Sequence, residues 1–288
     1  MKIGINLPLT PDPQKIRNYL TRLNEAGFAH FEINLGTVPL IINGQINEPW
    51  LVYMQDLLAE FPFTYSAHIG QGIDCRCEGN YETHKQALLS SVIAAGRLRC
   101  DPLVLHYEQK TGFTDTEARF FDAHAEAAQA AQAQGITLCV ENIEVEHVDP
   151  VIDFIHQINH PHLRMNYDLG HGFLASRYYG FDFLESLKKA LPLLGHLHLS
   201  DNAGTFEELR LTDRTTYDTM NLGYRFALGR GDVHLPPLWG SLPYGEVSEI
   251  LKGYRGIGIC EFYSDYFSPF LGKIHADMDA LFNPPVKS

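Results

Sequence analysis

Ionisable side chains recur at the ends of β-rich runs along this 288-residue chain. The third to the eighth of these runs each end in an imidazole or a carboxylate, in the order His68, His106, Glu141, Asp168, His198 and Glu261. Carboxylate plus imidazole is a ligand mixture suited to Zn, Mn, Co or Fe(II), and it is harder than a thiolate site. Gathered in one place without a cation, such groups would repel and desolvate one another. The sequence therefore predicts a divalent-metal site, provided that the fold brings the six strand ends together.

The elements that must position these residues are short β-rich runs alternating with longer helical segments. Several runs, such as ITLCVEN and LVLHY, are almost continuously apolar, which suits strands buried on both faces of a parallel sheet. The clearest helix covers Asp115–Gln134 and ends at Gly135. The candidate strands are Lys2–Asn6, His30–Leu35, Thr64–Ile69, Leu103–Tyr107, Thr137–Asn142, Arg164–Asp168, Gly195–Ser200 and Gly256–Phe262. Eight strands with helical crossovers and no Gly-rich first turn favour an α/β fold, a closed (β/α)₈ TIM barrel, over an open doubly wound sheet.

No internal repeat, low-complexity tract or linker divides the chain, so residues 1–288 are predicted to form a single domain. One connection is unusual: residues 202–240 are rich in polar, Gly and Pro residues and show little regular pattern. A loop of this length in a compact domain is usually functional or disordered. Because it follows strand seven, it lies on the face where barrel enzymes hold their active sites. We expect it to cover the active site, with Trp239 contacting the substrate.

The overall charge and the cysteines limit the partners and the compartment. A net charge of −13 argues against nucleic acid, whose affinity for proteins comes largely from Lys and Arg. The N-terminal MKIGINLPLT lacks the pattern of a signal peptide, and no apolar run is long enough to span a bilayer. The five cysteines are interpreted as reduced thiols, and the C-x-C spacing of Cys75 and Cys77 matches neither a zinc ribbon nor a thioredoxin motif. We expect a cytoplasmic protein with a small-molecule partner, and the sequence leaves room for a homo-oligomer.

Most of the remaining histidines are expected to have no role in the site. His196 lies two residues before His198, on the same strand face, and is predicted to pack one layer deeper in the barrel. Seven others are predicted to lie at the surface, namely His30, His84, His124, His156, His160, His162 and His275.

Six motifs follow one another in a fixed order along the chain. They are AHIG, VENIE, NYDLGH, HLHLSDN, GRGDVHLPPLWG and CEFY, five at strand ends and one in the long loop. In this order and at barrel spacing, the chain resembles the xylose-isomerase-like superfamily of TIM barrels. That superfamily includes sugar and sugar-phosphate isomerases and epimerases, inosose dehydratases and endonuclease IV. The resemblance covers essentially the whole chain.

The resemblance implies particular roles for these residues. In the ketose epimerases of the superfamily, one metal is held by the positions matching Glu141, Asp168, His198 and Glu261. The two glutamates also act there as the acid/base pair, and the position of His171 contacts a substrate oxygen. In endonuclease IV, a three-metal cluster uses further ligands, matching His68, His106, His171, Asp232 and His234.

Local departures decide between these two implied activities. His68 is followed by Ile-Gly-Gln where the endonucleases have Ala-Pro-Tyr, and His106 by Tyr-Glu where they have Pro-Gly. No Arg follows shortly after His198 as in the epimerases, so Arg210, Arg214 or Arg230 would have to replace it.

The leading hypothesis is a metal-dependent isomerase or epimerase of a sugar, sugar phosphate or polyol ketone, with proton transfer next to a carbonyl by Glu141 and Glu261. The alternative is phosphoester hydrolysis by a multi-metal centre of the endonuclease IV type. A metal-binding protein without catalysis is the third hypothesis.

Overall fold

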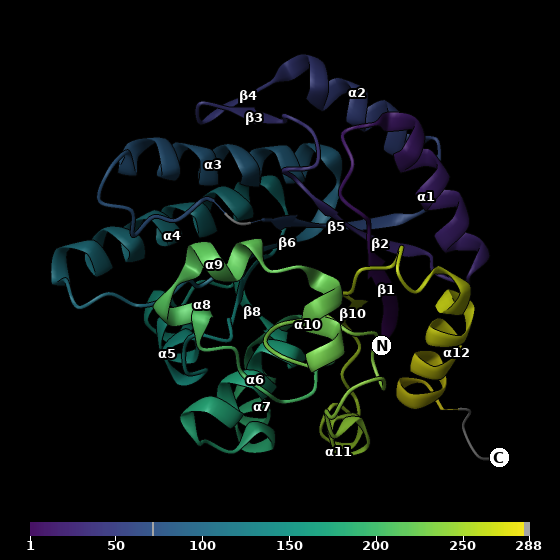
Figure 1. The fold of residues 1–288 in the computed structure, drawn as a ribbon. Coiled ribbons are helices and arrows are strands. Elements are labelled where there is room, and N and C mark those ends of the chain that lie inside the picture. The colour runs from purple at the N-terminus through teal and green to yellow at the C-terminus, as the bar shows by residue number, and fades with distance from the viewer. Residues whose placement is uncertain (71, 285–288) are drawn as a thin grey trace.

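Eight parallel strands close into a barrel in the computed structural model, which describes residues 1–70 and 72–284 (Figure 1). Around the barrel the strands run β1-β10-β9-β8-β7-β6-β5-β2, and β2 pairs with β1 to close it. Their bounds are β1 (Lys2–Asn6), β2 (His30–Asn34), β5 (Thr64–Ile69), β6 (Cys100–His106), β7 (Leu138–Glu141), β8 (Leu163–Asp168), β9 (Leu194–Leu199) and β10 (Ile257–Cys260). The predicted (β/α)₈ TIM barrel is confirmed.

The strand register places the ionisable residues of neighbouring strands at the same height along the barrel. His106 at the end of β6 is the pairing partner of Glu141 at the end of β7. Asp168 at the end of β8 is likewise the partner of His198 on β9. Because all strands of the barrel are parallel, these side chains lie at the same, carboxyl-terminal end.

Helices surround the barrel and bury its outer face. The first begins at Asp12, whose carboxylate accepts hydrogen bonds from the backbone N–H groups of Gln14 and Lys15. The predicted helix over Asp115–Gln134 is confirmed, and it ends at Gly135, whose φ of 68° is left-handed. These helices are α1 (Pro13–Glu25), α2 (Glu48–Ala59), α3 (Tyr81–Leu98), α4 (Thr114–Gln134), α5 (Asp149–Ile158), α6 (Leu169–Tyr179), α7 (Phe183–Ala190), α11 (Tyr244–Ile250) and α12 (Leu271–Phe282).

Two regions add structure that the sequence pattern does not indicate. A small hairpin, β3 (Ile41–Ile42) with β4 (Gln45–Ile46), stands apart from the barrel. The connection after β9 contains three short helices where an irregular loop was predicted, namely α8 (Leu209–Thr212), α9 (Arg214–Thr219) and α10 (Leu222–Leu228), drawn in green in Figure 1. Helices of four to seven residues are too short to show a helical period in the sequence.

Asp201 ties the two ends of this connection together. Its backbone exchanges two hydrogen bonds with Leu235, at 2.9 and 2.8 Å. Its buried carboxylate accepts from the backbone N–H groups of Gly240 and Leu242, at 2.9 and 3.1 Å. A side chain at position 240 would collide with this carboxylate, so glycine is required there.

Among the described helices, none is both long enough and apolar enough to cross a membrane.

Candidate metal centre

Glu141 stands at the middle of the candidate site, fully buried at the end of β7. Its Oε2 atom lies 3.1 Å from Nε2 of His68 and 3.8 Å from Nε2 of His106. Its Oε1 atom lies 3.1 Å from Nδ1 of His198 and 3.4 Å from Nδ1 of His171. Each carboxylate oxygen therefore faces a different pair of imidazoles.

The four residues expected to hold one metal form one compact group. One ligand atom each from Glu141, Asp168, His198 and Glu261 lies within 4.8 Å of all the others. Nδ1 of His198 is 2.9 Å from Oε2 of Glu261 and 3.7 Å from Oδ2 of Asp168. Asp168 also caps α6, because its Oδ1 accepts a hydrogen bond from the backbone N–H of His171 at 2.6 Å. Because Oδ1 forms this cap, Oδ2 is the oxygen of Asp168 that is available to bind a metal.

Two further groups satisfy the same distance criterion and contain the other five predicted positions. One is His68 with His106 and Glu141, which it shares with the first group. The other is His171 with Asp232 and His234, where Oδ2 of Asp232 lies 3.3 and 2.8 Å from the two imidazoles. The structure thus brings all nine predicted side chains to one end of the barrel.

The donor atoms of the centre fit a divalent cation. Oδ2 of Asp168, Oε2 of Glu261 and Oδ1 of Asp232 are buried and accept no hydrogen bond within the described part of the chain. An anionic oxygen buried without a donor is costly unless a cation or proton compensates it. The mixture of carboxylate oxygen and imidazole nitrogen is one that divalent transition metals accept.

The pKa shifts at the centre differ between carboxylates whose charge is balanced by imidazoles and one whose charge is not. Burial by itself would raise the pKa of Glu261, but the positive charges of His198 and His234 lower it to about 2. Glu141 behaves in the same way, with a pKa held well below its usual range against the effect of burial, chiefly by His198. Asp168 is the exception, because burial, with added repulsion from the two glutamates, raises its pKa to about 6. A bound cation would relieve that repulsion and displace protons from the imidazoles.

A cavity of about 1000 Å³ opens over the centre. Its floor includes His68, His106, His171 and Glu261. Its walls include Arg210, Tyr217 and Arg225 from the connection after β9, and Leu9, Tyr263 and Tyr266 from the loops that follow β1 and β10. The cavity is therefore polar at its base and partly aromatic at its rim.

Comparison with known proteins identifies the family. A profile of the xylose isomerase-like TIM barrel matches residues 20–282. The chain belongs to this family. No curated protein sequence matches it.

Solved structures of the family share the fold at low sequence identity. A D-tagatose 3-epimerase-like protein superposes with a TM-score of 0.72 at 17% identity, over 100% of both chains. D-psicose 3-epimerase from Clostridium cellulolyticum H10, solved with D-tagatose, gives 0.72 at 14%, over 98% of this chain and 99% of the other. A xylose isomerase-like TIM barrel protein from Mycobacterium smegmatis, in complex with magnesium, gives 0.70 at 16%, over 98% and 96%.

The arginines proposed to replace the epimerase arginine lie at different distances from the centre of this xylose isomerase-like barrel. Arg210 lines the main cavity and forms a short ion pair with Glu144 at 2.5 Å. Arg214 lines a smaller neighbouring cavity of about 360 Å³, together with His106 and Arg210. Arg230 does not line either cavity and lies 3.1 Å from Glu207.

Trp239, expected to contact the substrate, is placed elsewhere. Its ring packs edge-to-face on Phe267 and Phe270, with centroids 5.4 and 5.1 Å away. It is not among the described residues that line the cavity. The aromatic rim is made instead by Tyr263 and Tyr266, which the sequence pattern does not single out.

Two histidines predicted to lie at the surface are buried, and that prediction is wrong for them. His30 is 1% exposed, because it points into the barrel from the start of β2. His124 is 2% exposed, because it faces the barrel from α4 and contacts the Phe120 carbonyl. His196 is fully buried, as expected.

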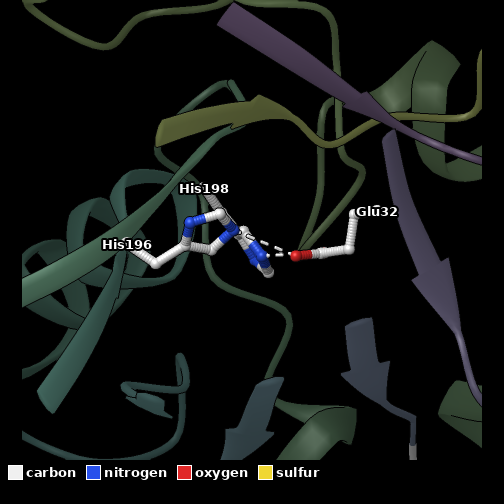
Figure 2. Close-up of side chains that lie close together, drawn as sticks. All are labelled: Glu32, His196 and His198. Carbon is white, nitrogen blue, oxygen red and sulfur yellow. Dashed lines mark hydrogen bonds and ion pairs between the residues drawn. The ribbon is translucent and has the colours of Figure 1, made fainter. Parts of the chain in front are cut away.

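Glu32, on β2, lies next to the centre and was not predicted from the sequence. Its Oε1 lies 3.0 Å from Nε2 of His198, and its Oε2 lies 3.0 Å from Nε2 of His196 (Figure 2). The sequence does contain an indication, since HFEIN places an acidic residue between the apolar residues Phe31 and Ile33. It was overlooked because Glu32 is inside its strand rather than at the end.

Proposed function

We propose that this barrel is a divalent-metal-dependent isomerase or epimerase of a sugar, sugar phosphate or polyol ketone. The observation that carries the proposal is that Glu141, at the end of β7, and Glu261, directly after β10, enter the same ligand group from different sides of the barrel. Two carboxylates converging on one point can remove a proton from a carbon and return it to a neighbouring carbon or the opposite face. The epimerase names of similar solved structures support the same reaction class.

A bound ion would polarise the substrate carbonyl and acidify the adjacent carbon-bound hydrogen. Glu141, Asp168, His198 and Glu261 would hold it. Because the pKa values of Glu141 and Glu261 are held low, both are ionised and able to accept a proton, although each is a weak base. His68 and His171 line the cavity beside them and would hold substrate oxygens. The connection over residues 202–240, through Arg210 and Tyr217, would cover the bound substrate.

A second candidate function is phosphoester hydrolysis by a multi-metal centre. The observation that favours it is the sharing of Glu141 between two ligand groups, together with the third group around Asp232. Glu141, with imidazoles at both oxygens, would serve in more than one ligand group, and a pair of ions held there would supply stabilisation of both oxygens of a phosphoryl displacement.

The number of bound ions and the Asp232–His234 pair separate the two functions. Wild-type protein should carry one tightly bound divalent ion by mass spectrometry, and it should exchange a ketose hydrogen with deuterated water. Asp232→Ala/His234→Ala should keep that ion and still exchange, at a reduced rate. Asp153→Ala/His156→Ala, on the exposed face of α5, is the matched control and should behave as wild type.

The opposite result would favour the hydrolase. Three ions in the wild type, fewer in the Asp232→Ala/His234→Ala variant, and nicking of abasic DNA lost in that variant would overturn the isomerase assignment.

A further inference from the structure

Glu32 lies on the far side of His198 from the candidate metal ligands. It is 2% exposed, and it shares its two oxygens between the imidazoles of His198 and His196, each at 3.0 Å. Figure 2 shows both rings turned toward this one carboxylate, which comes from β2. Ser66 donates a third contact to it, through Oγ at 3.1 Å. Oε2 of Glu32 therefore accepts two hydrogen bonds, and Oε1 has one ion-pair contact, with Nε2 of His198.

These contacts bear on which nitrogen of His198 carries a proton when a metal is bound. An ionised carboxylate only accepts, so the ring nitrogen that faces a carboxylate and does not bind the ion is the protonated one. For His198 that nitrogen is Nε2. Its other nitrogen, Nδ1, faces Glu141 and Glu261 at 3.1 and 2.9 Å. A histidine binds a metal through the ring nitrogen that carries no proton, and the partner of the other nitrogen sets which one that is.

A polar layer of the barrel holds Glu32 in place. Ser66 on β5 contacts both Glu32 and Nε2 of His30, the latter at 3.2 Å. Nδ1 of His30 in turn contacts Oγ1 of Thr64 at 2.8 Å. His196 contacts Glu32 from β9. The carboxylate is thus held by partners on two other strands, β5 and β9, and cannot turn away from His198 without breaking buried hydrogen bonds.

The same saturation argues against a separate ion at Glu32. Its carboxylate and the imidazoles of His196 and His198 meet the distance criterion for a metal group. However, Oε2 of Glu32 already accepts hydrogen bonds from His196 and Ser66, while Oε1 has an ion-pair contact with Nε2 of His198 at 3.0 Å. Neither oxygen of Glu32 is among the buried atoms of the described residues that lack a hydrogen-bond partner, although Nε2 of His198 is. The open acceptors lie on the other side of the His198 ring, at Asp168 and Glu261.

We propose that Glu32 is a positioning residue for the metal centre, which keeps the proton of His198 on Nε2 and aims Nδ1 at the ion. His196 and Ser66 support it by holding Oε2. This inference rests on the metal dependence in the proposed function, and it adds a carboxylate that never touches the substrate. Removal of Glu32 should lower the metal affinity, because it changes the orientation and the tautomer of one ligand, His198.

The test compares Glu32→Gln with the wild type in zinc affinity, measured by competition with a chromophoric chelator. Glutamine keeps the shape but removes the charge, and its amide can present either an acceptor or a donor to His198. Loss of such an outer partner typically weakens metal binding by about 10- to 100-fold, and that loss is expected here. Glu117→Gln, which removes the charged partner of Arg76 and touches none of the nine candidate ligands, should bind zinc as the wild type does.

A spectroscopic readout distinguishes positioning from general weakening of the fold. In zinc-loaded protein with ¹⁵N-labelled histidine, long-range ¹H–¹⁵N spectra should show His198 as a single tautomer protonated at Nε2. In Glu32→Gln this pattern should become mixed. Glu32→Asp, which keeps the charge but withdraws the carboxylate from His198, should also lose zinc affinity, and it serves if the glutamine variant does not fold.

Zinc affinity within about twofold of wild type in the folded variants would overturn the inference. An unchanged tautomer of His198 in Glu32→Gln would do the same. If the wild-type protein itself binds no divalent ion, the proposed function falls together with this inference. If the wild type binds zinc and the Glu32 variants bind it equally well, only the role of Glu32 falls.

Discussion

Charged side chains are buried both at the barrel mouth and on the outer side of the barrel near α4, but their hydrogen bonding differs. On the outer side, Arg76 is 4% exposed, and its guanidinium donates to both oxygens of Glu117 at 2.9 to 3.0 Å. It also donates to the Tyr107 carbonyl and lies 3.5 Å from the ring centroid of Phe120. At the mouth, Asp168, Glu261 and Asp232 each keep a buried oxygen without a hydrogen bond from the described residues.

The difference indicates what each buried charge is for. A charge that holds the fold together is satisfied by the chain itself, since an unpaired buried charge would destabilise the fold. A charge that binds a ligand must leave an acceptor open until the ligand arrives. Variants in the two regions should therefore separate activity from stability.

The largest effect is expected from Glu261→Gln at the mouth. Exchange of substrate carbon-bound hydrogen with deuterated water should fall by more than about 10⁴-fold, because the change removes a general base and a metal ligand together. Bound metal should fall as well, while the thermal unfolding midpoint in chelator should stay close to wild type. Glu249→Gln, an exposed glutamate on α11, is the control. Turnover near the wild-type rate would show that Glu261 is not the base.

Arg76→Met should instead lower the stability of the fold and leave metal binding intact. Methionine keeps contact with Phe120 but leaves Glu117 without its partner, so the free energy of unfolding in urea should fall by about 3 kcal/mol. Zinc affinity should not change. The exposed pair Arg17–Glu60 is the control, where Arg17→Met should lower the free energy of unfolding much less, because an exposed ion pair contributes little. Equal losses for the two arginines would contradict the comparison.

A smaller effect is expected from His124, which packs on Phe120 in the same outer region. Burial lowers its pKa to about 4, although the hydrogen bond to the Phe120 carbonyl acts in the other direction. As the pH falls below about 6.5, the unfolded chain takes up the proton first, so stability is present above that pH and is lost toward pH 4. This residue should account for about 2 kcal/mol between about pH 7 and about pH 5.

Urea unfolding of wild type and His124→Gln across that range isolates this contribution. The difference in their free energies of unfolding should change with pH as stated, because the groups of the metal centre titrate alike in both. A difference that is independent of pH would show that His124 is not buried as a neutral imidazole.

The candidate metal centre could be predicted because, from β5 to β10, an imidazole or a carboxylate lies at or next to the carboxyl end of each strand. In a parallel barrel, that pattern alone places His68, Glu141, Asp168 and Glu261 at one end. Asp232 and His234 follow no strand pattern, and only the family motif placed them near the others. Their position depends on the path of a connection that local sequence does not determine.

The residues that were missed depend on contacts between distant segments. Glu32 meets His198 across 166 positions of sequence, and nothing near either residue indicates the pairing. The burial of His30 and His124 depends on which face of β2 and α4 meets the barrel, and histidine is common on both kinds of face. The helices α8 to α10 are shorter than the window in which periodicity can be measured.

The tie at Asp201 bears on how this protein can change over evolution. The hydrogen bonds of Asp201 join the two points where the connection after β9 leaves and rejoins the barrel. The free-energy cost of closing the loop between them therefore depends only weakly on its length, and rises by about 0.6 kcal/mol for each doubling. Residues 203–228, which carry α8 to α10, can therefore be lengthened, shortened or exchanged with little strain on the barrel. Asp232 and His234 lie next to the tie at Leu235 and would keep their places. Descendants of this chain could acquire new cavity walls, and new substrates, around an unaltered set of ligands.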